Sequence, residues 1–122
     1  MKTPFDPRHK KRQKAVQLLY TQSFRKQATS DLLVKKVLEN QSFIDDKIKQ
    51  VAPEFPIEKI NKVDLAILRL GVYELVIDRG QPEKVVIDEA IELAKEFGGQ
   101  NSASFINGAL GRLVKDLKNE VS

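Results

Sequence analysis

The sequence lacks several residue types on which whole classes of protein depend. It contains no cysteine, which excludes a disulfide framework, a thiolate metal site and a cysteine nucleophile. His9 is its only histidine, so a catalytic or metal site built from histidines is not expected, and we expect no cofactor. The N-terminus has no apolar segment of the kind that a secretory signal needs. We therefore expect a cytoplasmic protein without a metal or thiol site.

Acidic residues are scarce at one end of the chain. Residues 1–26 hold eight Lys or Arg against one acid, a net charge of +7, whereas the whole chain carries +4. Such asymmetry points to a polyanionic partner, nucleic acid first and a membrane surface second. The alternative is a solvated terminus that binds nothing. Because the basic tract precedes the first apolar stripe, we expect residues 1–14 to form a basic, partly flexible segment. Replacing Arg8, Lys10, Lys11 and Arg12 with glutamine is expected to leave the fold almost untouched.

An unusually apolar stretch lies in the middle of the sequence. Eleven of the fifteen residues 63–77 are apolar, and on a helical wheel they cover nearly the whole circumference. A helix that is apolar all round is buried on most sides. The stretch is too short and too charged to span a membrane. It predicts a buried central helix, capped by Asn61 and preceded by a short helical turn at residues 57–60, in which Arg69 needs a partner such as Glu89 or Glu92.

Two stretches before this central helix carry apolar residues at helical spacing. Asp6 can cap the first helix, with Pro7 at its first position. The second stretch fits one helix of about twenty residues or two helices joined near residues 40–42. Its apolar stripe comprises Leu33, Val37, Ile44, Ile48 and Val51. Pro53 and Pro56 then bound a loop.

Two further apolar stripes follow the central helix, each with residues at relative positions 0, 4, 7 and 11, as on one face of a helix. They start at Val86 and at Ile106. Gly98 ends the first of these helices as its C′ residue, and Asn101 or Ser102 caps the second. Gly108 and Gly111 each cost about 1 kcal/mol relative to alanine inside a helix, which suggests close approach by a neighbouring helix or a ligand. No strand alternation occurs, so the sequence predicts one all-α domain over residues 1–122.

A catalytic function has little support in these residues. Asp88, Glu89 and Glu92 are close in sequence, but acids in the first turns of a helix ordinarily compensate the helix dipole. We therefore do not interpret them as an active site, and we expect the protein not to be an enzyme.

Four segments, in order, carry a resemblance to a known family. A basic run leads into AVQLLY, and VDLAILRLGVYEL, VVIDEAIELAKEFG and SFINGAL follow. Together they resemble the NusB family of transcription antitermination factors over residues 8–20 and 57–117. The resemblance implies a compact fold of two packed helical bundles around the central helix and no catalysis. It also implies binding to boxA-type single-stranded leader RNA of ribosomal RNA operons, together with the small-subunit ribosomal protein NusE, within an RNA polymerase antitermination complex.

The resemblance also assigns roles to individual positions. Tyr20 and Asp64 match positions that face the NusE partner. Asn101 stands where many members carry an acid, and an uncharged residue there repels phosphate less. The RNA-binding positions implied by the resemblance are Arg8, His9, Lys10, Lys11, Arg12, Gln17, Tyr20, Asn101, Phe105 and Asn107. Tyr20 and Phe105 also fit partly buried core positions, so both interpretations stay open here.

The chain departs from the family between its first helix and Pro53. The family usually has a short and a longer helix there, and this segment has room for little more than the longer one, so the first bundle is expected to contain two helices. Two other functions remain open. One is a helical protein–protein adaptor with a solubilising basic end, and the other is a NusB-like RNA-binding domain related to that of ribosomal RNA methyltransferases.

Overall fold

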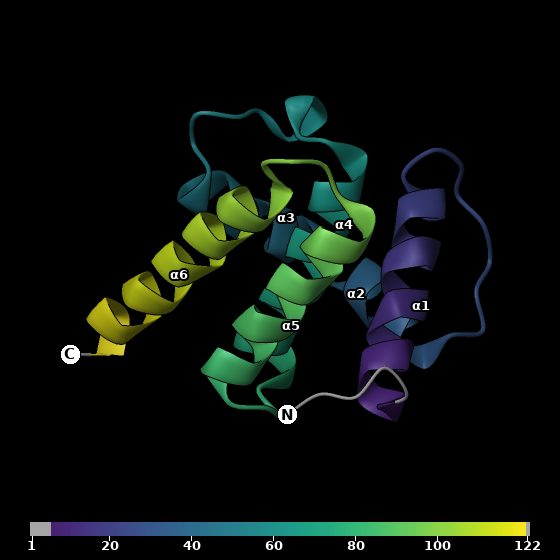
Figure 1. Ribbon diagram of the computed structural model, residues 1–122, viewed down its shortest axis with the longest axis horizontal. Helices are drawn as coiled ribbons and strands as arrows, with labels where there is room; N and C mark the ends of the chain where they lie inside the picture. The colour runs from purple at the N-terminus through teal and green to yellow at the C-terminus, as the bar shows by residue number, and fades with distance from the viewer. Residues whose placement is uncertain (1–5, 122) are drawn as a thin grey trace.

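All regular structure in the described part of the chain is helical. The computed structural model describes residues 6–121 (Figure 1). The α-helices are α1 (Pro7–Gln22), α2 (Leu32–Glu39), α3 (Gln41–Val51), α4 (Lys62–Val72), α5 (Glu83–Phe97) and α6 (Ser102–Val121). A 3-10 turn, η1 (Ile57–Lys59), precedes α4, and a π-helical segment, η2 (Tyr73–Asp78), continues it. The predicted all-α class is confirmed.

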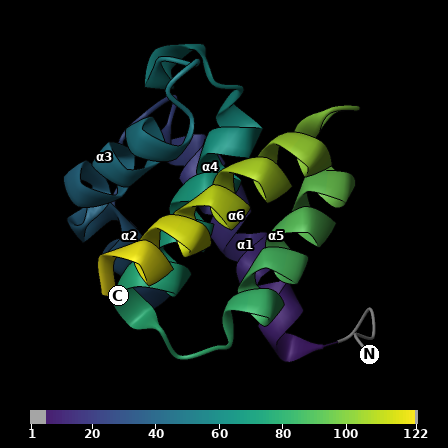
Figure 2. The ribbon, with the colours of Figure 1, turned by 90° about the vertical axis from the view of Figure 1, so that its left-hand side faces the viewer.

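Helix α4 lies at the centre and contacts α1, α3, α5 and α6. Helices α5 and α6 pack against each other as a hairpin on one side, while α1, α2 and α3 lie on the other (Figures 1 and 2). The expectation of only two helices in the first bundle is wrong, because residues 32–51 form two helices that meet at Asn40. The first bundle therefore contains three helices, because the segment between α1 and Pro53 forms two short helices and not one long helix.

The central helix begins and ends by identifiable backbone chemistry. The Asn61 side chain accepts hydrogen bonds from the backbone N–H groups of Val63 and Asp64, which confirms the predicted cap. At the other end the N–H of Arg79 donates to the carbonyl of Glu74, five residues earlier, and Arg79 has a left-handed φ of 57°. The sequence gives no sign of this π-helical ending.

The glycines of the second half have different roles from those expected. A Cβ on Gly71 of α4 would lie 2.9 Å from Leu110 Cδ1, so the close approach of α4 and α6 occurs at this glycine. A Cβ on Gly108 or Gly111 would meet no neighbouring helix within 4 Å, so the expected close approach by a helix is wrong at both glycines, while approach by a ligand stays a prediction. Helix α5 does end at Gly98, but the residue is extended rather than left-handed. A Cβ there would lie 2.5 Å from Ser102 Cβ, so lack of space explains the glycine.

Helix α1 starts earlier than a flexible basic segment would allow. Asp6 caps it by accepting from the N–H of Arg8, and this hydrogen bond lowers the pKa of the Asp6 carboxyl. Pro7 occupies the first position, as predicted. Residues 7–14 are thus the first two turns of a helix, and residues 1–5 lie outside the described part. Within residues 6–121, no helix combines the length and the apolar character that crossing a membrane requires.

Candidate nucleic-acid interface

The basic tract Arg8–Arg12 does not act as one unit. Residues on a helix succeed one another at about 100°, so a run of five necessarily faces in several directions. His9 and Arg12 point inward and are buried, whereas Lys10 and Lys11 are exposed. The expectation that the whole tract lies outside the core is wrong for His9 and Arg12, which we now assign to the structure of the domain.

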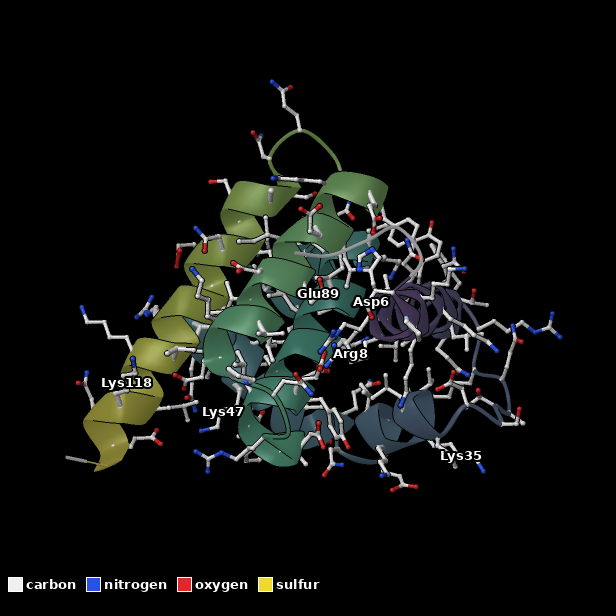
Figure 3. All side chains as sticks on the ribbon, turned by 60° about the horizontal axis from the view of Figure 1, so that its bottom comes forward. Asp6, Arg8, Lys35, Lys47, Glu89 and Lys118 are labelled. Carbon is white, nitrogen blue, oxygen red and sulfur yellow. The ribbon has the colours of Figure 1, made fainter. Side chains whose placement is uncertain are left out.

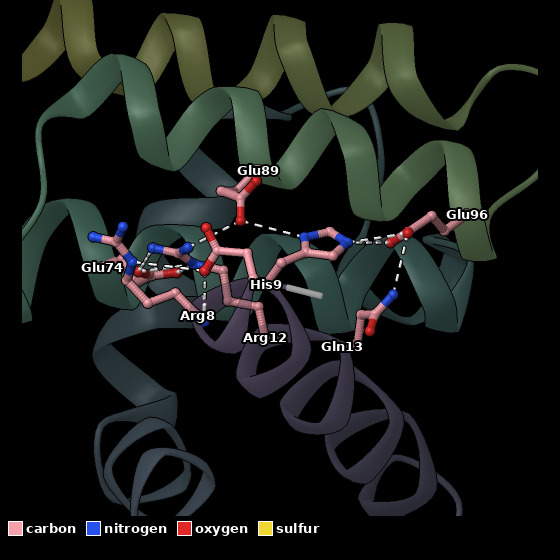
Figure 4. Close-up of polar contacts among 8 residues, drawn as sticks. Arg8, His9, Arg12, Gln13, Glu74, Glu89 and Glu96 are labelled. Carbon is pink, nitrogen blue, oxygen red and sulfur yellow. Dashed lines mark hydrogen bonds and ion pairs between the residues drawn. The ribbon is translucent and has the colours of Figure 1, made fainter. Parts of the chain in front are cut away.

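Arg12 is held by two glutamates from distant parts of the chain. Its Nε and Nη2 donate to the two carboxylate oxygens of Glu74 at 2.9 and 2.7 Å, a bidentate arrangement, and its Nη1 donates to Glu89 at 3.1 Å (Figure 4). All three side chains are buried. Burial alone would lower the pKa of the Arg12 guanidinium, but the hydrogen bonds and charge of Glu74 and Glu89 raise it overall. Arg12 is therefore fully charged and fully occupied.

His9 joins the same group of side chains, which we call the ion cluster: His9, Arg12, Gln13, Glu74, Glu89 and Glu96. Its Nδ1 lies 3.3 Å from Glu89 and its Nε2 lies 3.0 Å from Glu96, which also accepts from the Gln13 amide at 3.1 Å. Burial alone would lower the pKa of His9, but its hydrogen bonds to the Glu96 and Glu89 carboxylates, with their charges, outweigh burial and raise the pKa above its ordinary value. The cluster fastens the start of α1 to α5 and η2 (Figure 4).

Two predictions about charged residues in the core need correction. Glu89 is not a solvated, dipole-compensating acid, because its side chain is buried in the ion cluster. Arg69 does not pair with Glu89 or Glu92. Its Nε and Nη2 donate to the two oxygens of Asp45 on α3, at 2.9 and 3.0 Å. In both cases the partner comes from a helix that sequence spacing alone does not identify.

One exposed side of α1 carries lysines in its first turns and an aromatic residue, Tyr20, in its last turn. Lys10, Lys14, Gln17 and Tyr20 are exposed and lie on one side of the helix, since they are separated by three or four residues. From Lys10 to Tyr20 this face extends about 15 Å along the axis. Arg8 lies apart from it, 71% exposed, with its Nε 3.8 Å from Asp6 and near the buried Glu89 (Figure 3). We call Lys10, Lys11, Lys14, Gln17 and Tyr20 the outward face.

Helices α4 and α6 begin at the end of the molecule toward which α1 runs (Figure 1). A groove of about 370 Å³ lies between these two helix starts and the loop before α4. It brings together Phe55, Asp64, Asn101 and Phe105. The rings of Phe55 and Phe105 meet edge to face, with centroids 5.5 Å apart. Asp64 is only 8% exposed, and its Oδ1 has no hydrogen-bond partner among the described residues. This groove offers aromatic surface beside an amide and a carboxylate acceptor.

Three of the predicted site residues meet in the groove, and the others, Asn107 among them, do not. Asp64, Asn101 and Phe105 line it, whereas Asn107 is exposed two positions after Phe105, about 200° around α6. Phe105 is half-buried and touches the core, so its stacking and packing interpretations both keep support.

Sequence reasoning missed the aromatic residues of the loops. Phe55 is 48% exposed, and Phe24 lies after the end of α1, where its ring meets Tyr20 edge to face at 4.9 Å. Lys62 places its ammonium 5.4 Å from the Phe24 ring centroid. An aromatic between Pro53 and Pro56 belongs to no apolar stripe, which is the one signal that marks Phe55 as a surface residue. Within residues 6–121, no three His, Asp or Glu side chains are arranged to hold a metal ion.

Comparison with known proteins agrees with this architecture. The family model described as the NusB family matches residues 9–115. A transcription antitermination protein NusB of Clostridium botulinum (strain Kyoto / Type A2) is 49% identical over 82 residues, which is 67% of this chain and 57% of that protein. One from Dehalococcoides mccartyi is 41% identical over 85 residues, 70% of this chain and 59% of that protein. The chain therefore spans less than two thirds of the length of these relatives.

Solved structures show the same arrangement of helices. The NusB of T. maritima superposes with a TM-score of 0.82 at 32% identity, covering 94% of this chain and 93% of that one. A chain from a structure described as antitermination factors NusB and NusE in complex with double-stranded RNA gives a TM-score of 0.77 at 22% identity, covering 91% and 99%. At that identity the second likeness concerns the fold alone.

Proposed function

The chain belongs to the NusB family, and from this membership we propose that it is a non-enzymatic, RNA-binding transcription antitermination factor that acts in the cytoplasm. The observation that carries the proposal is the exposed outward face of α1, which begins with lysines in the first turns of the helix and runs toward the end of the molecule that holds the aromatic groove (Figure 1). We take residues 1–122 as one NusB-like domain for this purpose.

The ligand that fits these groups is single-stranded RNA. Specific RNA recognition favours unpaired bases, which stack on aromatic rings and expose edges to amides, while cations contact the phosphates. Phe105 offers a ring, Asn101 an amide beside it, and Lys10 and Lys11 exposed cations. By family membership we propose a boxA-type element of ribosomal RNA leaders as the target. Arg8, Gln17, Tyr20 and Asn107 are proposed as further RNA contacts.

The proposed protein partner is NusE, within an RNA polymerase antitermination complex. Support comes from the family and from the solved complex of NusB and NusE, whose NusB-like fold this chain shares. As contact residues for NusE we propose Tyr20, which is 38% exposed at the end of α1, and Asp64, which is buried near the start of the neighbouring α4.

The direct test is a binding titration of a boxA-type RNA and a scrambled RNA, each with and without NusE. We expect tighter binding of the boxA-type RNA, and a further gain when NusE is present. Phe105→Ala should weaken RNA binding by about 1–3 kcal/mol if a base stacks on this ring. Equal binding of both RNAs would refute the proposal. A protein that binds NusE but neither RNA would instead favour the adaptor function.

A further inference from the structure

A second hollow, distinct from the aromatic groove, lies on the other side of η1 and the first turn of α4. Its volume is about 650 Å³, within the usual range of ligand-binding clefts. The turn after α1 contributes Phe24, Arg25 and Lys26 to its lining, and α4 contributes Lys62. Glu58 and Lys62 line this hollow, whereas Lys59 and Asn61, between them in sequence, line the aromatic groove. Residues 57–62 thus form a ridge with one hollow on each side.

The charges and rings of this hollow suit a nucleotide. Three cations, Arg25, Lys26 and Lys62, line the hollow together with one acid, Glu58. Arg69 also lines it, but its charge is already paired with Asp45. Phe24 is 62% exposed, so most of its ring is open to a ligand. Its edge-to-face contact with Tyr20 and the ammonium of Lys62 hold the ring in place. Proteins that bind single-stranded nucleic acid stack the bases on aromatic rings and place cations along the phosphate backbone.

The turn that carries Phe24 is fixed before any ligand arrives. The side-chain amide of Gln22 donates to the carbonyl of Gln27 at 2.6 Å, and its oxygen accepts from the Gln27 N–H at 3.0 Å. The N–H groups of Phe24 and Arg25 both donate to the carbonyl of Thr21. These bonds hold the backbone of residues 22–27 in one turn, which reduces the ordering cost of binding.

We propose that this hollow binds a nucleotide of single-stranded RNA, with its base against Phe24 and its phosphate near Arg25, Lys26 and Lys62. The proposal rests on the proposed RNA-binding function and extends it, because a strand crossing the ridge places bases in both hollows. An acidic protein segment could meet the same cations, but it would leave the exposed ring of Phe24 without a stacking partner.

The test compares Phe24→Ala and Lys62→Gln with a matched pair elsewhere on the surface. Phe43 and Lys47 on α3 form the same kind of contact, with the ammonium 5.4 Å from the ring centroid, so Phe43→Ala and Lys47→Gln are the controls. A boxA-type RNA is titrated against each protein across a series of salt concentrations. We expect Phe24→Ala to lower affinity about 5- to 150-fold and Lys62→Gln to reduce the salt slope by about 0.7, with unchanged melting temperatures. The controls should bind as the parent protein does.

A set of RNAs with one abasic position each then locates the contact. If one base stacks on Phe24, the Phe24→Ala effect should vanish with the RNA that lacks that base and persist with the others. Normal RNA binding by both Phe24→Ala and Lys62→Gln, while Phe105→Ala is impaired, would overturn this second site and leave the RNA function standing. Loss of NusE binding with normal RNA affinity would assign the hollow to a protein and also overturn it. Failure of the parent protein to prefer the boxA-type RNA would overturn both proposals.

Discussion

The inward and outward faces of helix α1 carry similar cations in opposite surroundings. Arg12 is enclosed by Glu74 and Glu89, while Lys10 and Lys11, two positions and one position before it, face solvent. A buried charge must be paired, because an uncompensated charge in the interior costs several kcal/mol. An exposed cation has no such requirement and can interact with a phosphate. A run of basic residues is therefore not one functional unit, and its two faces should fail in different ways.

The largest effect should follow from Arg12→Leu. This change leaves Glu74 and Glu89 buried without their cation, and we expect a loss of about 3–5 kcal/mol in the free energy of unfolding. Chemical denaturation measures it. Arg8→Leu is the control, because that side chain is 71% exposed and should change stability by less than about 0.5 kcal/mol. Similar small losses in both variants would show that the inward face is not structural.

An exchange that keeps the charge sharpens the comparison. Arg12→Lys preserves the cation but removes the planar fork that bonds both oxygens of Glu74, so we expect a loss of about 1.5–3 kcal/mol. The reverse exchange Lys10→Arg, on the outward face, should leave the unfolding free energy unchanged within error. If Arg12→Lys unfolds at the same denaturant concentration as the parent, charge alone is what the ion cluster needs.

The outward face should respond in binding and not in folding. Replacing Lys10, Lys11 and Lys14 together with glutamine retains good helix propensity, so the melting temperature should hold. On a single strand each phosphate contact contributes about 0.7 to the slope of log affinity against log salt. If each of the three lysines contacts one phosphate, the slope of the variant should therefore be less steep by about 2. Affinity for a scrambled RNA should fall as well, because phosphate contacts carry no sequence information. An unaltered slope would remove these lysines from the interface.

The smallest effect concerns pH. The pKa of His9 is raised in the folded protein, so its contribution to stability is complete below its unfolded value of about 6.5 and is lost as pH rises through the folded value. The unfolding free energy should therefore decline modestly between about pH 6.5 and a higher pH near the folded pKa. His9→Gln should flatten this part of the profile, measured by denaturation at each pH. The same decline in the variant would assign the pH dependence to other groups.

Local patterns predicted the helices of this protein well. The central helix, the Asn61 cap and the start of α1 at Pro7 depend on neighbouring residues, and all three are confirmed. The partners of Arg12 and Arg69 depend on how helices pack, and no spacing rule specifies that Asp45 lies opposite Arg69. Three residues of the groove, Asp64, Asn101 and Phe105, were named from family resemblance, but the sequence did not predict that they meet. Phe55 was not named, since its place beside Phe105 follows from the path of a loop.

The ion cluster has a consequence for the order of folding. Its contacts join residues that are 62 to 87 positions apart, so each one closes a long loop. On the ribosome, Arg12 and His9 emerge long before Glu89 and Glu96 have been synthesised. Until then His9 and Arg12 are not enclosed, and the net charge of +7 on residues 1–26 is open to a polyanion on both faces of the tract. Arg12 is buried only when η2 and α5 pack against α1, and His9 only when α5 does, so α1 acquires separate inward and outward faces late in folding.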